Sequence, residues 1–185
     1  WMAASYQRTV FDAVMEAGRE FGVRLFAGQA LDSLRLEKGF GSWAREYRPL
    51  YTPFEAGFDR FVKLDPEAKG EFIGRDALVA KAAAGPDKSL VTLVIDAGIG
   101  DEAADVIGDE PVWFTGSGGG ESGVVGWVTS GGYAHCSDAS VAMAYVPAEL
   151  VGAHGIFEVE VLGVRRAATV QPEPLFDPSG QRMRG

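Results

Sequence analysis

The second half of the chain contains six short β-prone runs separated by turn residues, and this pattern restricts the possible folds more than any other feature of the sequence. The runs are rich in β-branched and aromatic residues, and glycine, proline, aspartate and serine gather between them. No long helical pattern separates the runs, so they do not suit the alternating strands and helices of a parallel sheet. They favour an antiparallel sandwich or barrel. We expect strands at residues 90–95, 111–114, 124–129, 141–146, 157–162 and 167–170.

The first half of the chain has a different character, with helical patterns around an aromatic-rich loop. Apolar residues recur at helical spacing between Ser5, a candidate N-cap, and Phe21, and Gly22 would end this helix. The pattern then predicts a β-prone run at 23–26, a shorter helix around 30–34, the aromatic-rich loop at 40–57, a strand at 58–64 and a helix at 74–84.

This change of pattern predicts two parts that join near residues 85–88. Gly85 and Pro86 end the last predicted helix, and most of the 25 glycines follow, where turns between short strands need them. We therefore expect an α+β fold. It would consist of a partial α+β domain over residues 1–87 and a small antiparallel β-barrel over residues 88–185.

The charge pattern argues against nucleic acid as a partner and leaves room for a small anion. The net charge is −9, the acids are spread along the chain, and the lysines and arginines form no long basic stripe. An anionic small molecule could still bind where a few arginines converge. Short-range attraction in a cleft exceeds the effect of distant, salt-screened charges.

The sequence also gives expectations about compartment and termini. The single cysteine, Cys136, excludes an intramolecular disulfide framework and suits a reducing compartment, so we expect a cytoplasmic location. No apolar run approaches the roughly 20 residues needed to span a bilayer, so no membrane partner is expected. Trp1 precedes the nearest methionine and begins no recognisable leader, and we interpret the amino terminus as a cut.

No metal-binding or nucleophilic cluster stands out in the sequence. The two histidines, His135 and His154, lack the spacing of a metal site. Cys136 directly follows His135, and neighbouring residues on a strand point to opposite faces, so a histidine-activated thiol is not expected. The glycine-rich segment 116–123 lies between two predicted strands and is typical of a hairpin connection, not of a phosphate-binding loop.

Arg35 is the most informative charged residue. It lies between Leu34 and Leu36, so at least one leucine must be buried beside it. A guanidinium held in such a place could bind a carboxylate through two parallel hydrogen bonds. The alternative is an ion pair with Glu37 or Asp32, because buried charges in packed domains are usually paired.

An aromatic-rich loop follows this arginine and contains Trp43, Tyr47 and Tyr51. These rings could simply cover the core. An aromatic loop placed just after a buried arginine also suits a flat heterocycle that carries an acidic tail. The residues alone leave both interpretations open.

Several motifs in order give the chain a family resemblance. The segments 32–37 (DSLRLE), 51–58 (YTPFEAGF) and 70–78 (GEFIGRDAL) resemble the T-protein, the aminomethyltransferase of the glycine cleavage system. Within that superfamily the sequence is most similar to the folate-binding carboxy-terminal region of dimethylglycine and sarcosine dehydrogenases. That likeness rests on segments 36–39, 126–133, 144–147 and 173–178, and the resemblance extends from about residue 10 to residue 184.

The resemblance implies a three-part folate enzyme. Tetrahydrofolate would lie in a central channel and accept a one-carbon unit from a small N-methyl amine or an aminomethyl carrier. In the dehydrogenase branch a flavin domain, with FAD, oxidises the amine first. The family's essential aspartate and pterin-binding glutamate lie upstream of the segment matched by Trp1. The resemblance therefore implies no catalytic residue in this chain, no turnover by the chain alone, and the remainder of its own polypeptide as a partner.

The resemblance also implies two folate-binding residues. Arg35 matches an arginine that the family uses near folate, where it would contact the glutamyl carboxylate. Trp43 stands where the T-protein pattern has tyrosine. Two departures from the pattern concern Leu31, which replaces an arginine, and residues 44–46 (ARE), which replace Gly-x-Asp. The alternatives are a non-catalytic folate-binding or regulatory member of the fold, and a barrel that serves as a docking surface for another domain.

Overall fold

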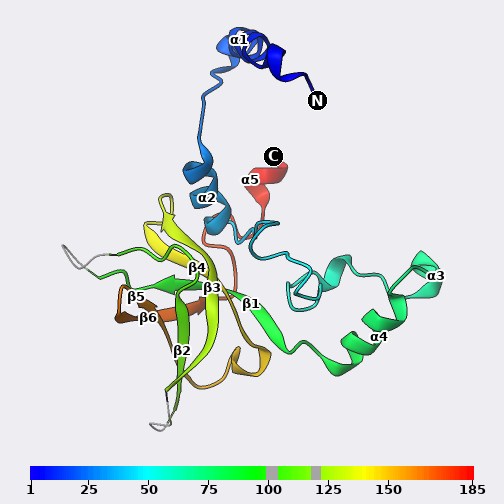
Figure 1. Cartoon of the computed structure of the whole chain (residues 1–185), viewed down its shortest axis with the longest axis vertical. Helices are drawn as coiled ribbons and strands as arrows, with labels where there is room; N and C mark the ends of the chain where they lie inside the picture. Colours follow the sequence, from blue (N-terminus) through cyan, green and yellow to red (C-terminus); the bar gives the residue numbers. More distant parts are fainter. Residues whose placement is uncertain (99–103, 118–121) are drawn as a thin grey trace. The chain divides into compact units, whose positions relative to one another are not determined.

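The structure, a computed structural model, describes residues 1–98, 104–117 and 122–185. Six antiparallel strands close into a barrel in the order β1-β4-β3-β2-β5-β6 (Figure 1). All six predicted strands and the α+β class are confirmed. The strands are β1 (Lys88–Ile95), β2 (Pro111–Gly116), β3 (Gly123–Ala134), β4 (Ala139–Pro147), β5 (Gly155–Val161) and β6 (Val164–Gln171).

The barrel core follows the two-residue alternation of its strands. On β1, Val91, Leu93 and Ile95 point inward and are buried. Strand β4 departs from this rule, because it is buried on both faces from Ser140 to Val146. One face of β4 joins the barrel core, and the other joins a second cluster that contains Leu36. The outer face of β4 is therefore covered by residues from the first half of the chain.

Helix α2 (Gly28–Glu37) provides that cover. Ser33 Oγ donates a hydrogen bond of 2.7 Å to the carbonyl of Tyr133 on β3. The backbone N–H of Phe176 donates to the carbonyl of Glu37 at 3.1 Å, which fastens the segment after β6 to the end of the helix. The last turn of α2, which carries Arg35, is thus fixed to the barrel.

Two compact units are present, Trp1–Leu31 and Asp32–Gly185. The first contains η1 (Ala4–Tyr6), α1 (Gln7–Ala17) and η2 (Arg19–Phe21). The prediction of one continuous helix capped by Ser5 was wrong, because α1 begins at Gln7 and ends before Gly18. At Gly18 an added Cβ would lie 2.6 Å from the Val23 side chain, so only glycine leaves room for Val23 to pack against this position. Residues 23–26 form no strand.

The strand predicted at 58–64 is also absent. The segment holds a 3-10 turn, η3 (Asp59–Phe61), and its aromatic rings pack against one another. The ring of Phe58 lies 4.6 Å from that of Tyr47 and 5.8 Å from that of Phe61. The remaining elements are α3 (Pro66–Lys69), α4 (Arg75–Ala84), η5 (Ala148–Leu150) and α5 (Gln181–Arg184).

The helix predicted at 74–84 is confirmed as α4, which begins after Gly74 and ends at Gly85. The connection expected at 116–123 joins paired strands β2 and β3, although residues 118–121 lie outside the described residues. The boundary between residues 87 and 88 stays a prediction. Within the described parts of the chain, no helix combines the length and apolar character needed to cross a membrane.

Candidate functional site

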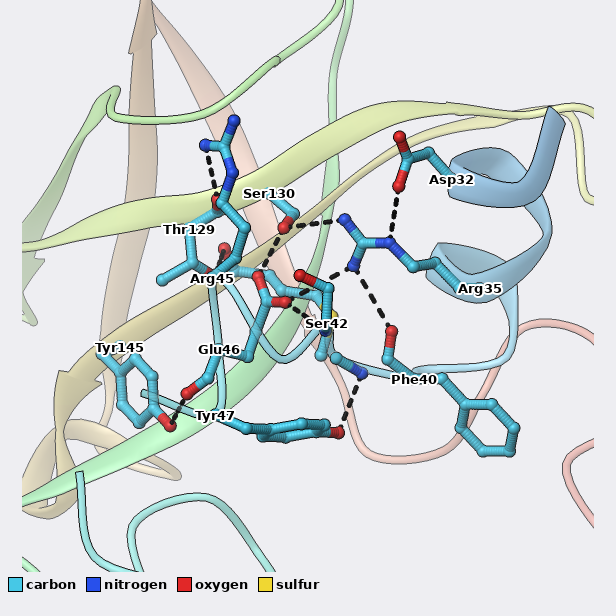
Figure 2. Close-up of polar contacts among 12 residues, drawn as sticks. Asp32, Arg35, Phe40, Ser42, Arg45, Glu46, Tyr47, Thr129, Ser130 and Tyr145 are labelled. Carbon is cyan, nitrogen blue, oxygen red and sulfur yellow. Dashed lines mark hydrogen bonds and ion pairs between the residues drawn. The ribbon is translucent and has the colours of Figure 1, made fainter. Parts of the chain in front are cut away.

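Arg35 lies in the last turn of α2 and points into a polar cluster between the helix, the loop 40–47 and strand β3 (Figure 2). Its side chain is only 16% exposed. Nε donates to Asp32 at 2.7 Å and Nη2 donates to the hydroxyl of Ser130 at 2.9 Å. Leu36 is buried, as the flanking leucines predicted, whereas Leu34 is half exposed. The helix thus buries one neighbour of Arg35 and holds the guanidinium at its inner edge.

Glu46 is the buried partner in this cluster. It has no exposed surface, and its Oε2 accepts a hydrogen bond of 2.6 Å from the backbone N–H of Ser42 and a longer one, 3.4 Å, from Arg35. Its Oε1 accepts from the Ser130 hydroxyl. Neither Glu46 nor Ser130 was predicted as a site residue from the sequence. No local pattern places Ser130 beside Glu46, since 84 residues separate them.

The guanidinium of Arg35 is largely committed to the protein. Four of its five N–H donors have acceptors, namely Asp32, Ser130, Glu46 and the carbonyl of Phe40. Two of these acceptors are carboxylates, so the positive charge is balanced locally. Of the two ion pairs considered from sequence, the one with Asp32 is present.

Glu37 is turned elsewhere, toward the turn after β3. Its carboxylate accepts from the backbone N–H of Cys136 at 2.9 Å and from the hydroxyl of Ser137 at 3.3 Å. Cys136 itself is exposed. Among the residues described, no group of three or more His, Cys, Asp or Glu side chains is arranged to hold a metal ion.

Trp43 lies on the surface, with 80% of the residue exposed, and it borders a shallow hollow of about 250 Å³. Tyr47, Arg48 and Tyr51 line the same hollow. The ring of Tyr51 stacks on that of Tyr145 with centroids 3.6 Å apart. The Tyr51 hydroxyl is buried and has no hydrogen-bond partner among the described residues. The structure therefore brings Trp43, Tyr47 and Tyr51 together around one hollow, and Arg35 does not line it.

Two tyrosine hydroxyls hold the backbone beneath this hollow. Tyr145 donates to the carbonyl of Glu46 at 2.9 Å, and Tyr47 accepts from the N–H of Gly41 at 2.8 Å (Figure 2). Burial raises the pKa of Tyr145 well above its usual value, and the nearby Tyr51 and Glu46 raise it further. Burial likewise raises the pKa of Tyr47. Both phenols are therefore neutral at physiological pH, which these hydrogen bonds require for Tyr145.

A second, more polar hollow of about 230 Å³ lies beside the same loop. Arg45 and Arg48 line it together with Asp109, Trp127 and Thr129. Arg45 Nη1 donates to the carbonyl of Thr129 at 3.2 Å. Arginines thus converge locally in an otherwise acidic chain. Arg48 borders both hollows.

A larger cleft, about 490 Å³, lies between the loop 38–60, strand β1 and the segment after β6. Tyr47 and Phe58 line it on one side and Glu173 on another. Lys38 also lines it, but its ammonium lies 3.1 Å from the carboxylate of Asp177. Burial raises the pKa of Asp177, but the hydrogen bond from Lys38 and backbone N–H donors outweigh this effect and hold that pKa below its usual value.

Comparison with known proteins places these features in a family. Residues 1–66 match the model of the GCVT N-terminal domain, and residues 88–177 match the glycine cleavage T-protein C-terminal barrel domain. The chain is 38% identical to mitochondrial dimethylglycine dehydrogenase of Homo sapiens over 94% of its own length and 19% of the relative. It is 36% identical to the aminomethyltransferase of Moorella thermoacetica over 92% of its length and 43% of the relative.

A solved structure agrees with these sequence matches. The glycine cleavage system aminomethyltransferase T from Bartonella henselae superimposes with a TM-score of 0.74 and 25% identity, over 94% of this chain and 45% of that protein. The chain therefore spans less than half the length of the relatives it matches.

Proposed function

Because the chain belongs to the glycine cleavage T-protein family, we propose that its protein carries out tetrahydrofolate-dependent one-carbon transfer. The observation that carries this proposal is the ordered match to both domains of the family, together with a closed six-stranded barrel. The finer proposal is aminomethyl or methylene transfer by a dimethylglycine or sarcosine dehydrogenase-like enzyme. It is supported by the identity to dimethylglycine dehydrogenase over nearly the whole chain.

In this proposal tetrahydrofolate accepts the one-carbon unit, and a small N-methyl amine or an aminomethyl carrier supplies it. The contribution of the described residues is binding and positioning. The proton-transferring residues, and FAD where an amine is oxidised first, belong to other parts of the polypeptide. General acid–base groups must lie within hydrogen-bond reach of the reacting atoms, so this chain without them would not turn over.

Trp43 and Arg35 are the residues proposed to form the folate site in this chain. Trp43 offers an exposed aromatic face beside Tyr47 and Tyr51, which suits a flat ring. Arg35 fixes the start of the loop that carries Trp43, through its contacts with the Phe40 carbonyl and Glu46. Its one uncommitted N–H donor is available to a ligand.

Turnover tests the reaction. The 185-residue chain is incubated with tetrahydrofolate and dimethylglycine or sarcosine, and 5,10-methylenetetrahydrofolate is measured, with an intact homologue as the positive control. We expect product from the homologue and none from this chain. Turnover by the chain equal to that of the homologue would overturn the proposed division of labour.

The roles of Arg35 and Trp43 are tested by the affinity for tetrahydrofolate. This affinity is measured by titration calorimetry on the protein that contains this chain. We expect Arg35→Ala and Trp43→Ala each to weaken tetrahydrofolate binding about tenfold or more, since stacking on an aromatic side chain or a charged hydrogen bond contributes on the order of 1–3 kcal/mol. Unchanged affinity in both variants would remove these residues from the site.

A further inference from the structure

We infer that Arg48 is the anion-binding residue of an aromatic acid site that spans the two hollows around the loop 43–52, an inference that rests on the proposed function and deepens it. The ligand class is a flat aromatic ring that carries a carboxylate. The aromatic hollow would take the ring, and the arginine between the hollows would take the carboxylate.

Arg48 has an uncompensated positive charge, whereas the charge of Arg35 is already balanced. Arg35 already faces Asp32 and Glu46, so an arriving anion would meet a cluster whose carboxylates outnumber its guanidinium. Arg48 is exposed, and within the described ranges its guanidinium makes no hydrogen bond or ion pair; only its backbone carbonyl is engaged, accepting from the N–H of Tyr51 at 3.1 Å. All five of its N–H donors are free for a planar, two-pronged contact with a carboxylate.

Arg48 also lies where the two hollows meet around the loop. Arg48 is the residue common to the aromatic hollow with Trp43 and Tyr51 and the polar hollow with Arg45. The volumes of about 250 and 230 Å³ each fall short of the roughly 300 Å³ at which pockets for small molecules usually begin. A ligand of ordinary size would therefore have to extend past Arg48 to use both.

The surroundings of Arg48 in the polar hollow are locally cationic. Arg45 and Arg48 share the polar hollow with one acid, Asp109, and Lys88 lies 4.7 Å above the ring of Trp127, another lining residue. This cationic spot is local, because the whole chain carries a net charge of −9. The buried, unpartnered hydroxyl of Tyr51 adds a polar atom at the aromatic side.

The experiment compares two probes on the protein that contains this chain, by titration calorimetry. One probe is 5-formyltetrahydrofolate, which has the glutamyl carboxylates, and the other is a tetrahydropterin that lacks the whole tail. The variants are Arg48→Ala, Arg48→Lys and, as a charge-matched control on the exposed carboxy-terminal turn, Arg184→Ala. Because the Arg48 guanidinium makes no hydrogen bond or ion pair with the described residues, the thermal midpoints of the two Arg48 variants should match that of the wild type.

We expect Arg48→Ala to lose about tenfold or more in affinity for the tailed probe and to leave the tail-less probe unchanged. The lysine variant should retain part of the affinity, and added salt should weaken tailed binding in the wild type more than in Arg48→Ala. The control should bind as the wild type does.

The failures are distinguishable. If neither probe binds the wild type, the folate proposal falls and the inference falls with it. If the tailed probe binds and Trp43→Ala weakens it while Arg48→Ala does not, the inference alone is overturned. An equal loss for both probes in Arg48→Ala also overturns it, since the anion would then have no part in the effect.

Discussion

Arg35 has two carboxylate partners that differ in burial. This difference determines how much stability the fold loses when either partner is replaced. Asp32 is 61% exposed, whereas the side chain of Glu46 is fully buried. When an exposed ion pair is broken, water replaces the lost contacts, and the free energy of unfolding changes little. A buried carboxylate that loses its charge leaves hydrogen-bond donors without an ionic acceptor in a place that water does not reach.

We predict that Glu46→Gln lowers the free energy of unfolding by about 2 kcal/mol, because it removes the buried negative charge beside Arg35 and leaves one oxygen to accept where the carboxylate has two. Asp32→Asn should lower it by less than about 1 kcal/mol. Urea unfolding followed by tryptophan fluorescence measures both. Each variant removes the charge of one carboxylate partner of Arg35. Equal losses of unfolding free energy in the two variants would therefore contradict the role assigned to burial.

Asp177 gives the fold an acid-sensitive contact. Its pKa is lowered in the folded protein, so its carboxylate stabilises the fold above the ordinary pKa of about 3.8, and this contribution disappears as the pH falls through the lowered value. We predict that Asp177→Asn unfolds more easily than the wild type at pH 6 and that the difference shrinks toward pH 3. Thermal midpoints across that range check the prediction, with Asp59→Asn as an exposed control. A constant difference would contradict it.

At the scale of the elements, the barrel strands were predictable and the first half was only partly so. Strands can be predicted from local sequence, because they are rich in β-branched residues and are separated by turn residues. The run 58–64 was predicted as a strand from its apolar residues, yet its rings Phe58 and Phe61 pack in an aromatic cluster with Tyr47, and the segment forms a 3-10 turn. Local pattern cannot reveal which neighbours will cover a ring.

The candidate site shows the same limit. The flanking leucines correctly predicted that Arg35 would have a buried neighbour, and the Asp32 pair was foreseen as an alternative. The Ser130 contact joins positions 95 residues apart, and no periodicity carries that information. Likewise, Arg48 shares its polar hollow with Asp109 and Thr129, which lie far along the chain from it.

The packing of β3 against β4 makes one glycine indispensable. A Cβ at Gly126 would lie 2.0 Å from the carbonyl oxygen of Tyr145 on the neighbouring strand. We predict that Gly126→Ala lowers the free energy of unfolding by about 3 kcal/mol, at the upper end of overpacking effects. Gly132→Ala is the matched control on the same strand, because its Cβ would meet only the end of Leu36, at 3.4 Å. Similar losses would contradict the explanation.

For the whole molecule, the buried hydrophobic core begins at Leu36. The unit Trp1–Leu31 contributes none of these core residues, and many of its apolar side chains are exposed. The described buried hydrophobic core therefore lies within Asp32–Gly185.

We predict that a chain without residues 1–27 keeps the unfolding free energy of the barrel within about 0.5 kcal/mol, as surface changes usually do. A chain without residues 172–185 should lose clearly more, because Phe176 bonds to Glu37 at the end of α2 and Asp177 pairs with Lys38 directly after it. Calorimetric unfolding of the two truncations measures this. A larger loss from the amino-terminal truncation would show that the core depends on it.

The closure of the barrel has a consequence for its biosynthesis. Strand β1 completes its pairing only with β6, where Thr92 faces Gln171 and Ile95 faces Ala168. At translation rates of about 5–20 residues per second, the ribosome needs on the order of ten seconds to synthesise β6 after β1. Throughout that interval a hydrophobic strand edge is left open to unwanted association. A nascent chain of this kind is a natural client for chaperones until its last strand emerges.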